Sequence, residues 1–216
     1  SEMLIFPKDL LLQGVFFYAI IKTKMSFDPS KDINIEQLWP TYMYAGRVDN
    51  IDNEKISEWI LDYKRNTESR KFSNRGGWQE SISDYQHEPI FKDYIQAIIQ
   101  TLKITKLKLT EETQLSIHSW ANVNEKGNWN LIHNHPGTDL SGVYYVKVPK
   151  NSGEILFFDP RKLDNVDAAF EEQPKIIGSH PVEGNLFMFP PYLEHMVTPN
   201  ESDETRISIA FNIVTK

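Results

Sequence analysis

The sequence contains no cysteine among its 216 residues. This absence excludes disulfides, zinc–thiolate sites and cysteine nucleophiles. Any metal site must therefore be built from histidine, aspartate, glutamate and water. Those harder ligands suit iron, manganese or zinc better than soft copper.

The sequence also lacks an excess of positive charge. Its 23 Lys and Arg residues are outnumbered by 30 Asp and Glu residues, which gives a formal net charge of −7. A protein that binds nucleic acid needs a positive surface to neutralise phosphates, so no nucleic-acid partner is expected. Hydrophobic residues make up 40% of the chain and aromatic residues 12%, which predicts a packed globular protein.

The apolar run at residues 10–21 (LLLQGVFFYAII) is too short for a membrane-spanning helix, which needs roughly 20 residues. It has the length of a signal-peptide core, but no small-residue cleavage site follows it. We expect a packed strand or helix, or a leader outside the functional core. The protein is accordingly expected to be cytoplasmic, with no membrane partner.

Two amphipathic helices are predicted in the first half of the chain. The first begins after Asp52 or Asn53 and has apolar residues at i, i+3, i+4 and i+7 counted from Ile56. The second begins at Pro89, a residue that suits a first helical turn, and carries an apolar face as far as Leu102.

From residue 113 onward, short runs rich in Val, Ile, Tyr and Phe alternate with turn residues. The runs are 113–122, 129–133, 140–148, 154–158, 175–181, 186–189, 196–198 and 205–214. About eight short strands predict a sandwich or barrel, the jelly roll among them. Residues 73–79 (SNRGGWQ) are expected to form a loop with a tight turn at the glycine pair. The expected fold class is mainly β with flanking helices (α+β), a double-stranded β-helix (jelly roll, cupin-like) core buttressed by the N-terminal helices.

The densest chemical signal is the segment NLIHNHPGTD, which contains His133 and His135. Side chains two positions apart on a strand point to the same face, so both imidazoles can reach one metal ion. The Pro-Gly pair that follows ends the strand and places these residues at a rim. A His-x-His pair alone is a weak motif, but His195, after a proline turn, supplies a third candidate ligand.

Arg206 and Ser208 lie at alternate positions of the last predicted strand, so their side chains point to one face, and the apolar residues at the intervening positions point to the other. One interpretation is a half-exposed strand with Arg206 in water. The functional interpretation places both residues inside the barrel mouth, where the guanidinium can bind a carboxylate through two hydrogen bonds. His118 lacks such neighbours and is expected to be packed or hydrogen-bonded within its strand.

The order of these segments resembles the iron(II)- and 2-oxoglutarate-dependent oxygenases. The His-x-His pair is followed by SGVYYV at 141–146, GEILFFDPR at 153–161, GNLFMFP at 184–190, His195 and Arg206-x-Ser208. More narrowly, these segments and SNRGGWQ resemble a 2OG-Fe(II) oxygenase group common in marine bacteria and their phages. The resemblance runs from roughly residue 36 to the end, so residues 1–35 are expected to be an N-terminal extension and residues 36–216 the oxygenase-like jelly-roll domain.

The resemblance implies a dioxygenase that uses Fe(II) and the cosubstrate 2-oxoglutarate and acts as a hydroxylase. It implies that His133 and His195 bind iron, and that Arg206 and Ser208 bind the far carboxylate of 2-oxoglutarate. Further residues expected to line the cosubstrate pocket are Tyr145, Asn122 and Asn130. The expected substrate is a small molecule or a peptide, and a homo-oligomer is left open.

The sequence departs from the wider superfamily at one position. Most members have a carboxylate two residues after the first histidine, where this chain has His135. Either His135 completes a three-histidine site, or Asp139 supplies a carboxylate, or water fills the position. Two other functions stay open: a three-histidine cupin-type metal enzyme that does not use 2-oxoglutarate, and a non-catalytic jelly-roll binding module. Residues 162–174 are interpreted as an acidic loop near the mouth, or as a solvated insertion.

Overall fold

The computed structural model describes residues 40–161 and 175–216. The expectations for residues 1–35, for the apolar run at 10–21 and for the loop at 162–174 lie outside the described residues. Residues 41–216 form one unit by their internal contacts. No helix in the described part of the chain has both the length and the apolar character needed to cross a membrane.

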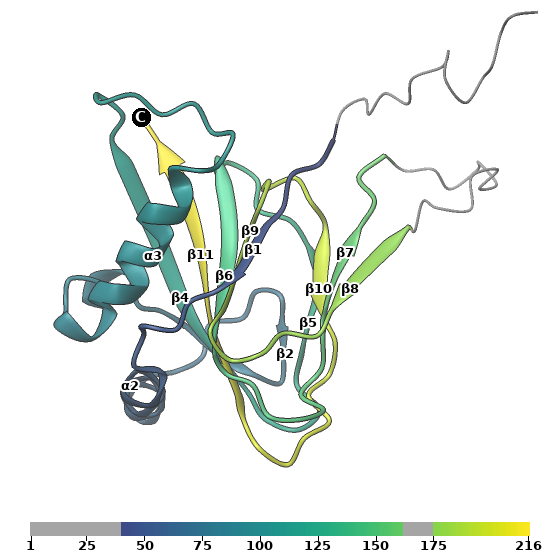
Figure 1. The fold of residues 1–216 in the computed structure, drawn as a ribbon. Coiled ribbons are helices and arrows are strands. Elements are labelled where there is room, and N and C mark those ends of the chain that lie inside the picture. Colours follow the sequence, from purple (N-terminus) through teal and green to yellow (C-terminus); the bar gives the residue numbers. More distant parts are fainter. Residues whose placement is uncertain (1–39, 162–174) are drawn as a thin grey trace, which may run out of the picture. The chain divides into compact units, whose positions relative to one another are not determined.

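Two antiparallel sheets form the β-core. The larger contains β1 (Tyr44–Arg47), β3 (Trp78–Ser81), β4 (Leu115–Asn124), β6 (Leu140–Lys147), β9 (Asn185–Phe189) and β11 (Arg206–Thr215). The smaller contains β2 (Asn74–Arg75), β5 (Trp129–His133), β7 (Ile155–Phe158), β8 (Ile176–Ser179) and β10 (His195–Val197). The strand orders are β1-β9-β6-β11-β4-β3 and β2-β5-β10-β7-β8, and the two sheets face each other (Figure 1). The predicted jelly-roll core is confirmed.

Two helices cover the face of the larger sheet that is turned away from the smaller one (Figure 1). Helix α2 (Asn53–Asn66) begins after Asp52, whose carboxylate accepts a hydrogen bond from the Lys55 backbone N–H at 3.2 Å. Such a cap satisfies one of the free N–H groups of the first turn. Helix α3 (Lys92–Leu102) follows two short 3-10 turns at Ser83–Tyr85 and Pro89–Phe91. Both predicted helices are therefore confirmed.

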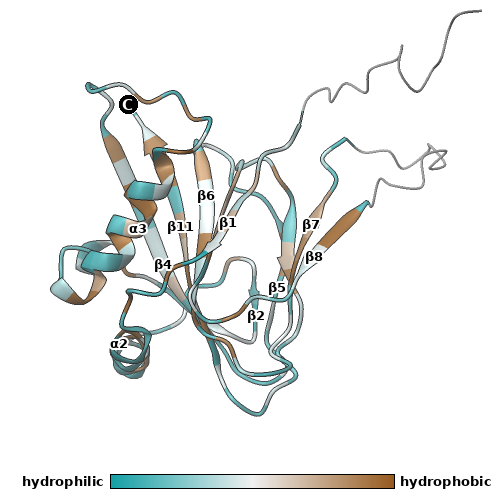
Figure 2. Cartoon of the chain, in the orientation of Figure 1, coloured by the Kyte–Doolittle hydropathy of each residue, from teal (hydrophilic) through white to brown (hydrophobic). Residues whose placement is uncertain are grey.

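The main hydrophobic core lies between these helices and the larger sheet. It combines Ile56 and Ile60 of α2 with Ile98 of α3, all fully buried. Strand β11 contributes alternate residues, among them Ile207 and Ile209, which are also fully buried. Figure 2 shows the corresponding apolar segments on α3 and on the strands beside it. This burial fixes the register of β11 and turns the opposite parity, which includes Arg206, toward the space between the sheets.

The segment at residues 73–79 was expected to be a loop with a tight turn at the glycine pair; the turn is present at Gly76 and Gly77, but the residues on either side of it form strands and not a loop. It contains β2 and the start of β3, joined through Gly76, whose φ of +83° suits a residue without a Cβ. Strand β2 pairs with β5, and β3 pairs with β4. Strand β1, which pairs with β9, was also not predicted. These short strands are stabilised by pairing with distant segments, which local sequence patterns do not report.

Candidate metal centre and cosubstrate cavity

Three histidines converge in the space between the sheets. His133 ends β5, His195 begins β10, and the two residues are paired across these strands. His135 lies beyond the end of β5, where its backbone N–H donates to the Pro191 carbonyl at 2.9 Å. One ligand nitrogen from each ring lies within 4.8 Å of the other two. His135 thus reaches the cluster from a loop, and not as a second side chain on the face of a strand.

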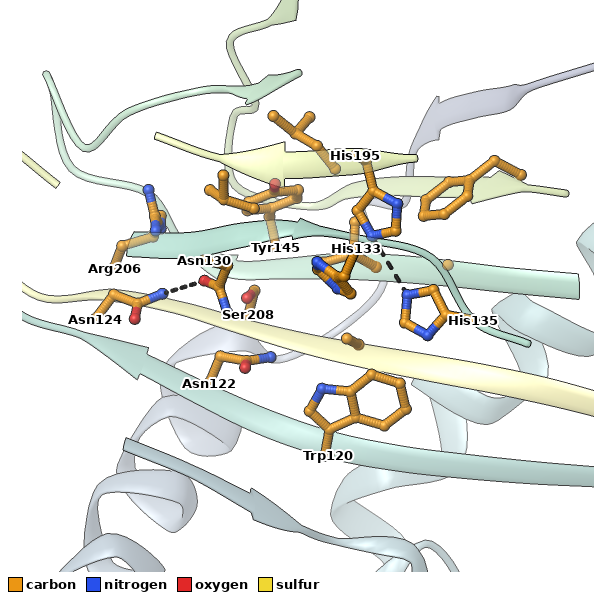
Figure 3. A pocket seen from close by; sticks show the side chains of 16 residues that line it. Trp120, Asn122, Asn124, Asn130, His133, His135, Tyr145, His195, Arg206 and Ser208 are labelled. Atoms are coloured by element: carbon orange, nitrogen blue, oxygen red, sulfur yellow. Dashed lines mark hydrogen bonds between the residues drawn. The ribbon is translucent and has the colours of Figure 1, made fainter. Parts of the chain in front are cut away.

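Backbone carbonyls orient two of the three rings. Nδ1 of His133 lies 2.7 Å from the Leu131 carbonyl oxygen, and Nδ1 of His195 lies 2.9 Å from that of Leu193. A carbonyl only accepts, so Nδ1 carries the proton in each ring and Nε2 has a free lone pair. Nε2 of His135 and Nε2 of His195 are 3.3 Å apart (Figure 3). The free Nε2 atoms of His133 and His195 are pre-oriented donors of the kind that a divalent metal ion requires, and the His135 ring lies within reach of the same point.

The surroundings keep these rings neutral. Burial lowers the pKa of His133 below its ordinary value. Burial and the proximity of His133 lower the pKa of His135 to about 4 and that of His195 to about 3. The ring of Phe189 lies 4.7 Å from that of His195, and Phe157 packs on the same side. The cluster is therefore available to a metal ion at neutral pH without first losing a proton.

Asp139 does not lie at the cluster. One of its carboxylate oxygens accepts hydrogen bonds from the backbone N–H and the hydroxyl of Thr215, at 2.7 and 2.8 Å. Asp139 is absent from the group of potential metal ligands found among the described residues, which consists of His133, His135 and His195. Of the three alternatives for the third ligand, this arrangement favours His135.

Arg206 is buried in the same cavity, with only 1% of its surface exposed. Its Nη1 donates to the carbonyl oxygens of Ser152 and Thr198. Its Nη2 has no hydrogen-bond partner, and no carboxylate within residues 40–161 and 175–216 forms a salt bridge with it. Burial lowers the pKa of the guanidinium. A buried cation without an anion is costly, so the site is suited to an anionic ligand.

The other predicted cosubstrate residues line this cavity as well. Ser208, Tyr145, Asn122 and Asn130 are all buried and border the same space as Arg206 (Figure 3). The Tyr145 hydroxyl has no hydrogen-bond partner in the described part of the protein. Burial raises the pKa of Tyr145 to about 12, although Arg206 acts in the opposite direction. This hydroxyl therefore stays protonated and can donate to a bound carboxylate.

Among the cavity residues that sequence reasoning missed are Asn124 and Trp120, both on β4. Asn124 is buried, its Oδ1 has no partner, and its Nδ2 lies 3.5 Å from Asn130 Oδ1. Trp120 also borders the cavity, with its ring 5.8 Å from that of His135. Both lie an even number of positions from Asn122 on β4, so their side chains point to the same face of the strand as that of Asn122. This alternation is the signal that could have identified them. His118 lies at such a position too, and it is exposed, so the expectation that it is packed is wrong.

Comparison with protein families gives one match. Residues 118–212 match the model of a family described as "Putative 2OG-Fe(II) oxygenase". The matched range runs from β4 to β11 and contains every residue of the cavity described above. No curated protein matches the chain.

Solved structures with similar folds include enzymes of this type. A prolyl hydroxylase from Trichoplax adhaerens, in complex with a peptide fragment of hypoxia inducible factor, is 12% identical, with a TM-score of 0.57 and coverage of 80% of this chain and 83% of its own. A viral collagen prolyl hydroxylase from Paramecium Bursaria Chlorella virus-1, in complex with 2OG, is 15% identical, with a TM-score of 0.56 and coverage of 80% and 95%.

A third similar structure is HygX from Streptomyces hygroscopicus, with nickel and 2-oxoglutarate bound. It is 8% identical, with a TM-score of 0.55 and coverage of 81% of this chain and 83% of its own. At these identities the likeness extends to the fold, which is the jelly roll that the sequence predicted.

Proposed function

Through residues 118–212 the chain belongs to the 2OG-Fe(II) oxygenases, and on this premise we propose that His133, His135 and His195 bind Fe(II) while Arg206 binds 2-oxoglutarate. The protein is a non-haem, 2-oxoglutarate-dependent dioxygenase. The proposal adds the residues of its site and the reaction type, hydroxylation of an unactivated C–H bond.

The donor chemistry of the cluster fits iron. Three imidazole nitrogens, from two rings oriented by backbone carbonyls and from His135, form a compact set, and no carboxylate among the described residues joins this group. Imidazole suits Fe(II), Zn(II) and Ni(II) alike, so the ligands alone do not select the metal. Three neutral ligands leave the full charge of the divalent ion in place, which strengthens the attraction for an anionic cosubstrate in the same cavity.

The observation that carries the proposal is the unpaired Nη2 of Arg206 in a cavity shared with the histidines. A guanidinium with a free edge binds a carboxylate with defined geometry. The unpaired hydroxyl of Tyr145 and the hydroxyl of Ser208 border the same space. A dicarboxylic 2-oxo acid satisfies both ends of this cavity, one carboxylate at Arg206 and the oxo-acid end at the histidine cluster.

When bound, Fe(II) and 2-oxoglutarate supply the oxidation: dioxygen is consumed, 2-oxoglutarate becomes succinate and carbon dioxide, and a substrate C–H bond is hydroxylated. The residues of this chain orient and enclose the reactants. Arg206 and Tyr145 neutralise and orient the far carboxylate, and the Phe157 and Phe189 rings keep water from the buried side of His195.

Binding and turnover with matched variants test this proposal. Anaerobic titration should show one site for Mn(II), as an inert substitute for Fe(II), and a site for 2-oxoglutarate that depends on Mn(II). His133→Ala should abolish Mn(II) binding, whereas His87→Ala, at an exposed histidine, should leave it unchanged. Succinate formation from Fe(II), 2-oxoglutarate and oxygen would then distinguish the oxygenase from a three-histidine enzyme that does not use 2-oxoglutarate.

Failure to bind Mn(II) or Fe(II) would instead favour the non-catalytic binding module.

We further propose that the substrate is a small molecule or a peptide. A cytoplasmic location is also part of the proposal, since Fe(II) and 2-oxoglutarate are both maintained in that compartment. The similar prolyl hydroxylase in complex with a peptide fragment supports a peptide substrate.

A further inference from the structure

A groove of about 600 Å³ lies next to the histidine cluster. It shares Trp120, His133 and His135 with the cavity that contains Arg206. Its other walls are the segment at residues 70–73, strand β3, and the parts of β4 and β11 nearest His118. A molecule bound in the groove therefore contacts two of the proposed metal ligands without occupying the space around Arg206.

Gln79, on β3, carries the first sign of a ligand in this groove. Its side chain lines the groove and only 5% of the residue is exposed, yet its Oε1 has no hydrogen-bond partner among the described residues. The main chain of Gln79 is fixed: its N–H donates to Ser69 Oγ at 3.0 Å, and its carbonyl accepts from the Arg70 N–H at 2.8 Å. A buried amide oxygen held without a donor is unfavourable, so a ligand N–H or O–H fits this position.

The described residues that line the groove leave no fixed charge unpaired. Arg70 and Glu80 both border it, and they form a salt bridge with each other at 2.8 Å. The remaining polar groups are the imidazoles and neutral hydroxyls and amides, namely Ser73, Ser81, Ser83, Ser119, Asn134 and Asn212. Apolar surface comes from Trp120 and from the exposed side chains of Phe72 and Ile132, which are 65% and 48% exposed. This lining suits an uncharged ligand with both amide and apolar groups.

One wall of the groove is a strand edge with room for an extended chain. Strand β2 pairs with β5 at Trp129 and Asn130, and the Leu131 N–H donates to the Ser73 carbonyl at 2.8 Å. Residues 131–135 all line the groove in sequence, although β5 ends at His133 and the His135 N–H is bonded to Pro191. In the part of the chain that the structure describes, no strand pairs with Ile132 and His133, the last two residues of β5, on the side of β2. An extended peptide can lie along such an edge with its side chains alternating between the groove and solvent.

We propose that this groove binds the primary substrate as an extended, uncharged peptide segment. Gln79 accepts a hydrogen bond from a peptide N–H, and Trp120 and Phe72 contact an apolar side chain whose C–H bond faces His133 and His135. This inference rests on the proposed function, because only the metal centre makes the groove a place where a C–H bond is oxidised.

A synthetic library of N-acetylated, C-amidated hexapeptides tests the inference directly. The full chain, loaded with Mn(II) and 2-oxoglutarate so that no turnover occurs, is incubated with the library, and retained peptides are identified by mass spectrometry. Retained peptides are expected to be uncharged at the residues that contact the groove. The affinity of the best peptide should fall about tenfold or more in Gln79→Leu, because the Oε1 acceptor is lost.

Two further variants keep the result interpretable. Gln96→Leu, at an exposed glutamine of α3 far from the groove lining, should bind the peptide as the wild type does. Phe72→Ala removes an exposed side chain and leaves the core intact, and it should weaken the peptide about threefold or more. Both Gln79→Leu and Phe72→Ala should bind Mn(II) and 2-oxoglutarate with wild-type affinity.

Several results would overturn the inference. They are retention of no peptide, retention that depends on charged side chains, and equal peptide affinity in wild type and both groove variants. If the wild type does not bind Mn(II) or 2-oxoglutarate, the proposed function itself is wrong, and this is a different outcome. The two failures are therefore distinguishable in one set of titrations.

Discussion

His133 and His195 are direct partners across β5 and β10, and their ring centroids lie 4.4 Å apart. Each Nδ1 is directed at a backbone carbonyl, so the Nε2 atom of each ring keeps a free lone pair. Neither of these two nitrogens can donate to the other in this tautomer. A cation bound by both lone pairs gives the two acceptors a partner that they cannot give each other.

Metal binding should consequently stabilise the fold. A ligand that binds only the native state at about 100 times its dissociation constant adds roughly 2.7 kcal/mol. For a chain of this size, that corresponds to an increase in Tm of about 5–10 °C. Thermal unfolding with Mn(II) and after addition of EDTA measures the effect. His195→Ala should abolish the increase and His87→Ala should retain it; an equal shift in both variants would contradict binding at the cluster.

Much of this arrangement could be predicted from the sequence. The parity of β11 placed Arg206 and Ser208 opposite the apolar residues that include Ile207, because burial of one face fixes the other. Gln79 could not be identified in this way. It lies in a four-residue strand whose pairing partner is more than 30 positions further along the chain, and its importance depends on an unpaired oxygen that only coordinates reveal.

His135 is the position at which this chain departs from the common ligand set. His135→Ala should weaken Mn(II) binding about 10–100-fold, since even the loss of a group that supports a metal ligand costs that much. His135→Asp should recover most of the affinity, because a carboxylate also binds Fe(II) and Mn(II). Anaerobic titration with Mn(II) measures both. Unchanged affinity in His135→Ala would mean that water occupies this coordination position.

Gly142 should be intolerant of any side chain. A Cβ at this position in β6 would meet the ring of Phe211 and, at 2.5 Å, the backbone oxygen of Phe187. Overpacking of this kind typically costs about 1–3 kcal/mol. Urea unfolding of Gly142→Ala should show this loss of stability. Gly46→Ala is the matched control, because nothing lies within 4 Å of its added Cβ. Equal stability of the two variants would show that β6 shifts at no cost.

Asp139 should matter for stability and not for metal binding. Its carboxylate accepts two hydrogen bonds from Thr215 near the end of β11. Asp139→Ala removes both at an exposed position and should lower the free energy of unfolding by about 1 kcal/mol. Mn(II) affinity, measured in the same preparation, should equal that of the wild type. A large loss of Mn(II) affinity at unchanged stability would instead identify Asp139 as the carboxylate ligand.

Arg206 should determine affinity for 2-oxoglutarate while contributing little to the stability of the ligand-free fold. Loss of one partner in a buried charge pair costs about 2–5 kcal/mol, so Arg206→Met should weaken 2-oxoglutarate binding at least about 30-fold. Mn(II) binding should persist, because the histidines do not contact the guanidinium. Arg206→Met removes an unpaired buried cation, which is favourable, but it also removes the Nη1 donor to the Ser152 and Thr198 carbonyls, which is unfavourable. Because the two effects oppose each other, the free energy of unfolding without ligand should change little. The control for the loss of charge is Arg65→Met, at an exposed arginine of α2.

Calorimetric titration of both variants with 2-oxoglutarate in the presence of Mn(II) measures the affinities. Wild-type 2-oxoglutarate affinity in Arg206→Met would remove the central contact on which the cosubstrate assignment depends.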